Sequence, residues 1–320
     1  MGSQRLTTTL CGISLKTPVL AASGTFGYGI EFEEIVDLNA LGGLVTKGLS
    51  REPIAGNPSP RLWHTQSGMM NSVGLQNVGV AAFLRDKLPK LRRYSVPVFA
   101  NVFGYSIEDY VEVVRALEAA EGIAAYELNV SCPNTKKGGM FFSSDPALLA
   151  EVVASVRSIA RRPVIVKLSP NVARIEPFAK AAEEVGADAV SLINTVVSFA
   201  LDVETGKPRI AAGFAGLSGP AIKPLALRMV AEAAAVVKIP VIGLGGIATG
   251  HDAAEFLLAG ASAVQVGTAS FVDPRAPDLV ARELDRLLQK IGLHHVRDLV
   301  GTLERSVSVP LPNADPRRAQ

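Results

Sequence analysis

Cysteine is scarce in this chain, and its scarcity excludes several kinds of site. The 320 residues include only two cysteines, Cys11 and Cys132. Two thiols alone can hold neither an iron–sulfur cluster nor a structural zinc ion, which take more ligands. So few cysteines are also typical of a reducing compartment, and we expect a cytoplasmic protein.

A strong charge of one sign and a long apolar run are absent as well. The 32 basic and 30 acidic residues nearly cancel, so charge gives no reason to expect nucleic acid or an anionic membrane as a partner. The longest apolar runs, such as Ala259–Val266, are interrupted by Gly and Ser and are too short to span a bilayer. Met1–Thr9 lacks the basic-then-apolar order of a signal peptide. With 48% hydrophobic residues, the composition predicts a folded protein with a large core.

What the chain does contain is a regular alternation of short apolar runs and longer segments of helical period. The runs are nearly continuous in apolar residues, as parallel strands covered on both faces are. The predicted strands are Val19–Ala22, Gly43–Lys47, Val96–Asn101, Ala124–Val130, Val164–Leu168, Ala187–Ile193, Val241–Leu244 and Ala263–Val266. The predicted helices lie near Glu31–Leu38, Val80–Leu91, Ile107–Leu117, from Asp145-Pro146, Ile175–Ala182, Ala221–Val237, Asp252–Leu258 and Pro277–Ile291.

This alternation predicts an α/β fold, a (β/α)₈ TIM barrel. The alternative is an open doubly wound sheet, which the number of strands and the lack of a G-x-G-x-x-G after the first strand disfavour. We expect Leu6–Leu15 to form a short N-terminal hairpin, and the long connections Gly48–Val78 and Asn194–Gly219 to be substrate loops. One catalytic domain, residues 1–305, and a mobile C-terminal tail, residues 306–320, complete the predicted organisation.

Two glycine-bearing turns follow the last two predicted strands. They are Gly243-Leu244-Gly245-Gly246-Ile247 and Gly267-Thr268-Ala269. In barrel enzymes, loops at these positions bind phosphate through backbone N–H groups. With no Walker loop, this favours a phosphate-bearing cofactor such as FMN or pyridoxal phosphate.

Lysines and asparagines end several of the other strands. Lys47 and Lys167 could each be a Schiff-base lysine or a cation beside a flavin. Asn101, Asn129 and Asn194 end three further strands, and Asn71 lies in the first long loop. An amide both donates and accepts, so a ring of amides can recognise a ligand with cyclic imide or urea edges.

The run Glu127-Leu128-Asn129-Val130-Ser131-Cys132-Pro133-Asn134 resembles the active-site motif of the dihydroorotate dehydrogenases, flavoenzymes of pyrimidine biosynthesis. The similarity covers roughly Leu6 to Gly301 and includes Ala21–Gly24, Lys47, Asn71–Leu75, Asn194-Thr195 and the glycine turns. Cysteine at position 132 is similar to the class 1 enzymes, because the membrane-linked class 2 enzymes have serine there and an N-terminal extension. Thr135–Gly139 and Leu201–Pro208 are similar to the 1B form rather than to the fumarate-reducing 1A form.

The resemblance implies oxidation of dihydroorotate to orotate, with Cys132 as the base and one FMN per chain. It implies that electrons pass to NAD⁺ through a partner subunit that carries FAD and a 2Fe–2S cluster, in a heterotetramer of two copies of each subunit, with this chain forming a homodimer. The substrate-binding positions it implies are Lys47, Asn71, Ser72, Val73, Gly74, Leu75, Asn129, Asn134, Asn194 and Thr195. The cofactor-binding positions it implies are Ser23, Lys47, Gly48, Asn101, Asn129, Lys167, Ile193, Gly219, Gly245, Gly246, Gly267 and Thr268.

Three alternatives stay open at this point. The chain could be a fumarate-reducing class 1A enzyme or an FMN-dependent dihydropyrimidine dehydrogenase, for which turnover of uracil compounds would be the test. It could also be a flavin-binding barrel without turnover. No metal site is expected in the chain itself.

Overall fold

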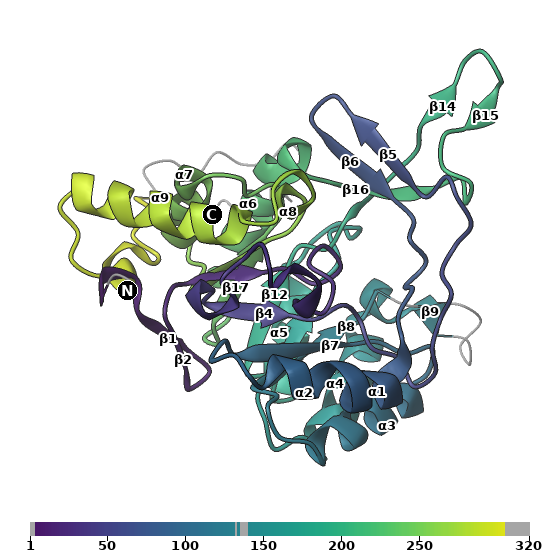
Figure 1. The fold of residues 1–320 in the computed structure, drawn as a ribbon, viewed down its shortest axis with the longest axis horizontal. Coiled ribbons are helices and arrows are strands. Elements are labelled where there is room, and N and C mark those ends of the chain that lie inside the picture. The colour runs from purple at the N-terminus through teal and green to yellow at the C-terminus, as the bar shows by residue number, and fades with distance from the viewer. Residues whose placement is uncertain (1–3, 132, 135–139, 305–320) are drawn as a thin grey trace, which may run out of the picture.

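A computed structural model describes residues 4–131, 133–134 and 140–304. Within them, eight parallel strands close into one barrel, in which each strand lies beside the next barrel strand along the chain (Figure 1). The barrel strands are β3 (Val19–Ala21), β4 (Gly43–Val45), β7 (Val98–Val102), β8 (Ala125–Asn129), β11 (Val164–Lys167), β12 (Ala189–Leu192), β17 (Val241–Leu244) and β18 (Ala263–Val266).

Each barrel strand overlaps the range that the sequence predicts, and the (β/α)₈ barrel is confirmed. The ring closes because β18 pairs with β3, with Val266 opposite Ala21. The alternative of an open doubly wound sheet is therefore wrong. The predicted tail, residues 306–320, lies outside the described residues, so the division of the chain at residue 305 stays a prediction.

The bottom of the barrel is closed by the predicted N-terminal hairpin. Strands β1 (Thr8–Leu10) and β2 (Ile13–Leu15) pair antiparallel. Their buried residues Leu10 and Leu15 pack into the barrel interior against apolar side chains such as Phe99. Cys11, at the turn, donates from Sγ to the Asp188 carbonyl at 3.4 Å. Burial and the nearby Asp188 charge raise the pKa of Cys11 to about 12.

Helices cover the outside of the barrel and follow the predicted pattern, with two exceptions and one short helix, Ala269–Val272, that the sequence does not predict. They are α1 (Gly79–Ala82), α2 (Leu88–Leu91), α3 (Ile107–Glu118), α4 (Pro146–Arg157), α5 (Glu176–Glu184), α6 (Lys223–Ala234), α7 (Gly250–Leu258), α8 (Ala269–Val272) and α9 (Ala276–Lys290). The Ser106 hydroxyl accepts from the amide of Asp109 at 3.3 Å and begins α3. The Asp145 carboxylate accepts from the amide of Ala147 at 2.8 Å and begins α4. Polar N-caps thus set these helix starts, as predicted.

The predicted helix Glu31–Leu38 is wrong. The chain forms two 3₁₀ turns there, Ile30–Phe32 and Leu38–Ala40. The Glu31 carboxylate accepts from the amide of Tyr28, and the Asp37 side chain accepts from the amide of Asn39. Side chains that bond to nearby backbone amides compete with a continuous helix, and here they win.

The predicted helix Val80–Leu91 is interrupted. A π-helical turn, Phe83–Lys87, separates α1 from α2. Pro89 has no N–H to donate, and its ring collides with the carbonyl of the preceding turn in a regular α-helix. The proline therefore explains why the regular hydrogen-bond pattern breaks just before it.

The two long connections form a small second sheet that the sequence does not predict. Strands β5 (Leu62–Thr65) and β6 (Gly68–Asn71) come from the first connection, and β13 (Val196–Ser198) and β16 (Ala215–Ser218) from the second. They pair antiparallel in the order β13-β16-β6-β5. This sheet and the hairpin β14 (Leu201–Asp202)–β15 (Lys207–Pro208) rise from one end of the barrel (Figure 1). A short pair, β9 (Pro133–Asn134) and β10 (Met140–Phe141), follows β8.

Candidate active site

A cavity of about 750 Å³ opens at the carboxyl ends of the barrel strands, beneath the second sheet. This volume lies within the roughly 300–1,000 Å³ typical of small-molecule sites. Among its lining residues are the predicted Ser23, Lys47, Gly48, Asn71, Ser72, Val73, Gly74, Leu75, Asn101, Asn129, Lys167, Ile193, Asn194, Thr195, Gly219, Gly245, Gly246, Gly267 and Thr268. Cys132 lies outside the described residues, as does the side chain of Asn134. The fold thus brings every predicted site residue whose side chain is described to one cavity.

The second sheet forms the roof of this cavity by joining its two long loops. Asn71 on β6 pairs with Gly216 on β16, and the Asn71 Nδ2 lies 3.5 Å from the Gly216 carbonyl. Sequence reasoning missed Leu62 and Met69, two apolar residues of the sheet that also line the cavity. Only the pairing of two segments far apart in the chain brings them there.

Polar side chains from two strand ends bond to one another on one wall of the cavity. The Asn194 Nδ2 donates to the Asn129 Oδ1 at 3.3 Å and to the Ser131 Oγ at 3.1 Å. The Asn194 Oδ1 accepts from the amide of Thr195 at 2.8 Å. Because amides and a hydroxyl both donate and accept, this wall can exchange its internal bonds for bonds to a polar ring.

Two lysines line the cavity in different electrostatic surroundings. Lys47 is half-buried, and burial together with the nearby Arg61 charge lowers its pKa, while Glu31 opposes the shift. Lys167 is almost fully buried, and its Nζ lies 3.5 Å from the Glu127 Oε1. Sequence reasoning gave Glu127 no role. The available signal was a carboxylate in the middle of a predicted strand, Ala124–Val130, that is otherwise hydrophobic up to Asn129 near its end.

Glycines without room for a side chain form the opposite end of the cavity. Gly246 has φ +80°, and a Cβ there would lie 2.9 Å from the Gly219 carbonyl oxygen and 2.7 Å from the Lys223 Cβ. Gly219 has φ +92°, and a Cβ there would lie 2.9 Å from the Gly68 Cα. Backbone can approach an anion closely at such positions, and they follow β17 and precede α6, where barrel enzymes bind phosphate.

The cavity also presents an unused hydrogen-bond acceptor. Asn101 is buried and lines the cavity, and its Nδ2 donates to the Glu127 Oε1 at 2.8 Å. Its Oδ1 has no hydrogen-bond partner among the described residues. A buried acceptor left without a partner costs free energy, so it is fitted to a ligand that brings an N–H group. With the glycine-lined end for a phosphate, these residues can hold a phosphate-bearing cofactor that brings an N–H group, and a flavin is one such cofactor.

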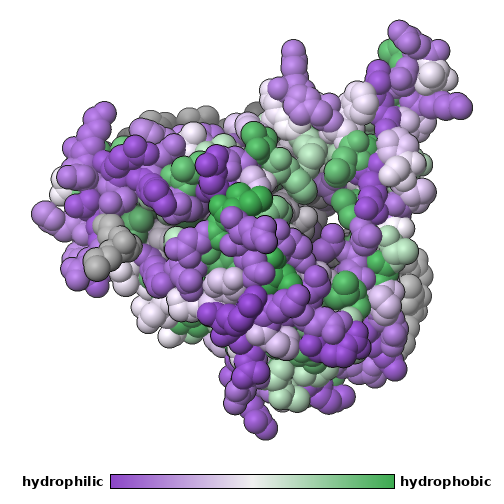
Figure 2. Space-filling model, viewed as in Figure 1, coloured by the Kyte–Doolittle hydropathy of each residue, from purple (hydrophilic) through white to green (hydrophobic). Residues whose placement is uncertain are grey.

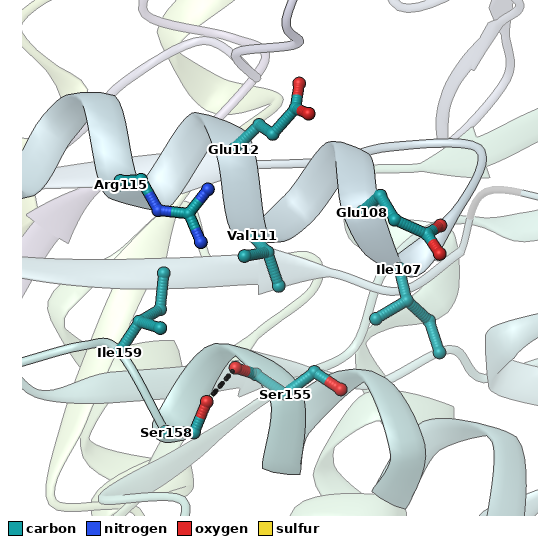
Figure 3. A pocket seen from close by; sticks show the side chains of 8 residues that line it. All are labelled: Ile107, Glu108, Val111, Glu112, Arg115, Ser155, Ser158 and Ile159. Carbon is teal, nitrogen blue, oxygen red and sulfur yellow. Dashed lines mark hydrogen bonds between the residues drawn. The ribbon is translucent and has the colours of Figure 1, made fainter.

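A second cavity, of about 380 Å³, lies on the outside of the barrel between α3 and α4 (Figure 3). None of the predicted site residues lines it. Its Glu112 is paired with Arg51 at 2.8 Å, and its Ser158 donates to the Ser155 carbonyl at 2.8 Å. These groups are used in holding neighbouring segments together, and nothing in this cavity resembles a catalytic arrangement.

Comparison with known proteins decides the family. The family model of dihydroorotate dehydrogenase matches residues 5–288. The chain belongs to the dihydroorotate dehydrogenase family. Dihydroorotate dehydrogenases are flavin-dependent oxidoreductases, so the chain is an enzyme of that kind, and the alternative of a flavin-binding barrel without turnover is disfavoured.

Individual relatives of this chain carry two kinds of name. A protein of Solibacter usitatus, provisionally named a dihydroorotate dehydrogenase A (fumarate), is 67% identical over 94% of this chain and 99% of its own length. The catalytic subunits of dihydroorotate dehydrogenase B (NAD⁺) from Geobacter sulfurreducens and Citrifermentans bemidjiense are 52% and 51% identical. These alignments cover 93% and 92% of this chain, and 98% and 97% of the relatives.

In the described part of the chain, no helix combines the length and the apolar character needed to cross a bilayer. The face shown in Figure 2 is mainly hydrophilic, with small separate hydrophobic patches.

Proposed function

We propose that this chain is the FMN-binding catalytic subunit of an NAD-linked enzyme that makes orotate for pyrimidine biosynthesis. The observation that carries the proposal is the single cavity in which a phosphate-type glycine end, two lysines, an unpaired amide oxygen and a cluster of asparagines meet. When bound, FMN supplies the acceptor for the hydride that leaves C6 of dihydroorotate.

Cys132 is proposed as the base that takes the proton from C5. The support is its place in the chain, directly after Ser131, which lines the cavity. A thiol with an ordinary pKa of about 8.5 is only a few per cent thiolate at neutral pH. A base of this kind contributes about 10²–10⁴-fold in rate.

The other predicted residues divide between the substrate and the cofactor. We assign the pyrimidine ring and its carboxylate to Lys47, Asn71, Ser72, Val73, Gly74, Leu75, Asn129, Asn134, Asn194 and Thr195. We assign FMN to Ser23, Lys47, Gly48, Asn101, Asn129, Lys167, Ile193, Gly219, Gly245, Gly246, Gly267 and Thr268. In this assignment Lys167 is the cation that stabilises negative charge on the flavin ring.

The electrons are proposed to leave through a second subunit with FAD and a 2Fe–2S cluster, in a heterotetramer built on a homodimer of this chain. The chain's two cysteines cannot hold such a cluster, and the B-type relatives are named as catalytic subunits, a name that implies a second component. The low cysteine content also supports a cytoplasmic location.

Fumarate is a second candidate acceptor, favoured by the name of the Solibacter relative. The two proposals predict different behaviour of the chain alone. As a B-type subunit, it reduces artificial acceptors with dihydroorotate, gives negligible NADH, and forms NADH once the iron–sulfur subunit is added.

The experiment is a steady-state assay of the purified, FMN-loaded chain with dihydroorotate and each acceptor in turn. Efficient reduction of fumarate by the isolated chain would establish the A-type reaction instead. NADH formation without a partner would contradict the scheme of electron transfer. Mass spectrometry of the released flavin tests the cofactor, because FAD in place of FMN is incompatible with the proposal.

A further inference from the structure

Beneath the floor of the cavity, the fully buried carboxylate of Glu127 binds side chains from four other barrel strands. Its Oε1 accepts from the Asn101 Nδ2 at 2.8 Å and lies 3.5 Å from the Lys167 Nζ. Its Oε2 accepts from the Ser191 Oγ at 2.9 Å and from the Gln265 Nε2 at 2.7 Å. All four partners act as donors, so together they match an ionised carboxylate.

Two of these partners, Lys167 and Asn101, line the cavity, whereas Ser191 and Gln265 do not. We propose that Glu127 is a positioning residue that keeps the Lys167 ammonium charged and holds the Asn101 amide with its oxygen free for the flavin. The proposal rests on the function proposed above, because it assumes that FMN occupies this cavity. It assigns a role to a side chain that touches neither substrate nor cofactor.

The physical reason lies in the burial of Lys167, which is 5% exposed. A buried lysine without a counter-ion loses its proton far more easily than one in water, whereas an opposite charge within about 4–6 Å favours the charged form. The strands that pair with β11 place Asn129 and Ser191, both neutral, opposite Lys167. Among the described residues that line the cavity, the other charged side chain is Lys47. Glu127 is thus the group that can keep Lys167 charged.

The same contacts fix the direction of the Asn101 amide. Because a carboxylate only accepts, the amide must turn its NH₂ toward Glu127. Its Oδ1 then remains as the acceptor, and this atom has no partner among the described residues. Glu127 therefore presents one positive charge and one acceptor to the same cavity.

Glu127→Gln is a nearly isosteric test of the charge. The oxygen of the new amide still accepts from Asn101 and Lys167, while its NH₂ faces Ser191 and Gln265. The Ser191 hydroxyl can accept instead of donate, and the Gln265 amide can rotate to offer its Oε1, which has no partner among the described residues. The substitution thus removes the charge and leaves most hydrogen bonds possible.

A merely structural role for Glu127 predicts a different result from a charge-holding role. If Glu127 only ties strands together, Ser191→Ala and Glu127→Gln should each weaken FMN binding by a factor that does not change with pH. If it keeps Lys167 charged, only Glu127→Gln should make FMN binding depend on pH. Ser191→Ala, which removes one hydrogen bond and no charge, is therefore the matched control.

The experiment measures the dissociation constant of FMN for the apoprotein by flavin fluorescence, from about pH 7.5 to about pH 9, where the phosphate of FMN, with a second pKa of about 6, stays almost fully doubly ionised. Every variant is made in the Cys132→Ala background, so that ionisation of this thiol contributes nothing. For Glu127→Gln, affinity relative to the parent should fall as pH rises, by roughly tenfold or more, the size of one charge-assisted hydrogen bond. The double variant with Lys167→Met, which lacks both charges, should bind weakly, with the same pH profile as the parent.

A Glu127→Gln profile parallel to that of the parent would overturn the proposal, as would a pH dependence that persists in the double variant. If Glu127→Gln does not fold, Lys167→Met tests the pair from the other side. Without its cation, the buried carboxyl has a raised pKa, so the apoprotein should lose stability relative to the parent as pH rises from about 5 to about 8. A pH-independent stability difference would contradict the pairing. Failure of the parent itself to bind FMN would instead count against the proposed function.

Discussion

Gly246→Ala tests the glycine-lined end of the cavity, and its cost follows from the geometry. The residue has φ +80°, and a Cβ would lie 2.7 Å from the Lys223 Cβ and 2.9 Å from the Gly219 carbonyl oxygen. Lys223 cannot move away by changing rotamer, because the contact is with its Cβ at the start of α6. The left-handed backbone costs about 1–2 kcal/mol, and forcing atoms into a packed site costs about 1–3 kcal/mol.

Gly213→Ala is the matched control. Gly213 has the same φ of +80°, but nothing lies within 4 Å of the position that a Cβ would take there. Urea unfolding of the two apoproteins should therefore show a loss of about 1–2 kcal/mol for Gly213→Ala and about 2–5 kcal/mol for Gly246→Ala. FMN affinity should fall only for Gly246→Ala. Equal losses of stability in the two variants, or unchanged FMN affinity in Gly246→Ala, would refute the reasoning.

Three further predictions concern Cys132, Cys11 and Lys47. Cys132→Ala should bind FMN and orotate but reduce its flavin about 10²–10⁴-fold more slowly in stopped flow, and Cys132→Ser should recover partly at high pH; a rate equal to that of the parent removes Cys132 as the base. Because the pKa of Cys11 is raised to about 12, thiol titration of the folded protein at neutral pH should not modify Cys11; mass spectrometry showing rapid labelling of Cys11 is the contrary outcome. The folded-state pKa of Lys47 is lowered, so the charged side chain destabilises the apoprotein at pH values below the lysine's unfolded pKa. Lys47→Met should therefore stabilise the apoprotein at pH 7, less so near pH 10, and should weaken orotate binding. Chemical denaturation at the two pH values measures the sign and size of the change in stability.

The barrel could be predicted from the sequence because its strands carry a strong local signal. The run Val241–Leu244 has no polar side chain, and Val164–Leu168 is apolar apart from Lys167. Both runs are bounded by Gly, Pro or polar residues, and the strands form at these places. The caps at Ser106 and Asp145 are also local, since each side chain bonds to an amide two or three residues away. Features that depend only on residues close together in the sequence can therefore be predicted from the sequence.

The two errors in the helix predictions have physical causes that the spacing of apolar residues does not show. At Glu31–Leu38 the apolar spacing suits a helix, but the carboxylates of Glu31 and Asp37 bond to nearby amides instead. Pro89 was a visible signal for the break in the segment Val80–Leu91, and its consequence is the π-helical turn.

The site could be predicted only as far as its residues lie at strand ends or match the family's motif. The roof, in which β6 pairs with β16 across 145 residues of chain, is a long-range pairing with no local signal. The network around Glu127 joins residues from five strands, and a single sequence does not show which side chains share the barrel interior. Tertiary contacts of this kind require the structure.

The central claim is that FMN bound in this cavity is reduced by dihydroorotate. One anaerobic titration tests this claim most directly. FMN-loaded protein receives dihydroorotate in small portions while the visible absorbance of the flavin and the formation of orotate are followed together. The account predicts that the flavin bleaches with one orotate formed per flavin reduced, and that dihydrouracil has no such effect. A flavin that stays oxidised with dihydroorotate, or that bleaches equally with dihydrouracil, would contradict it.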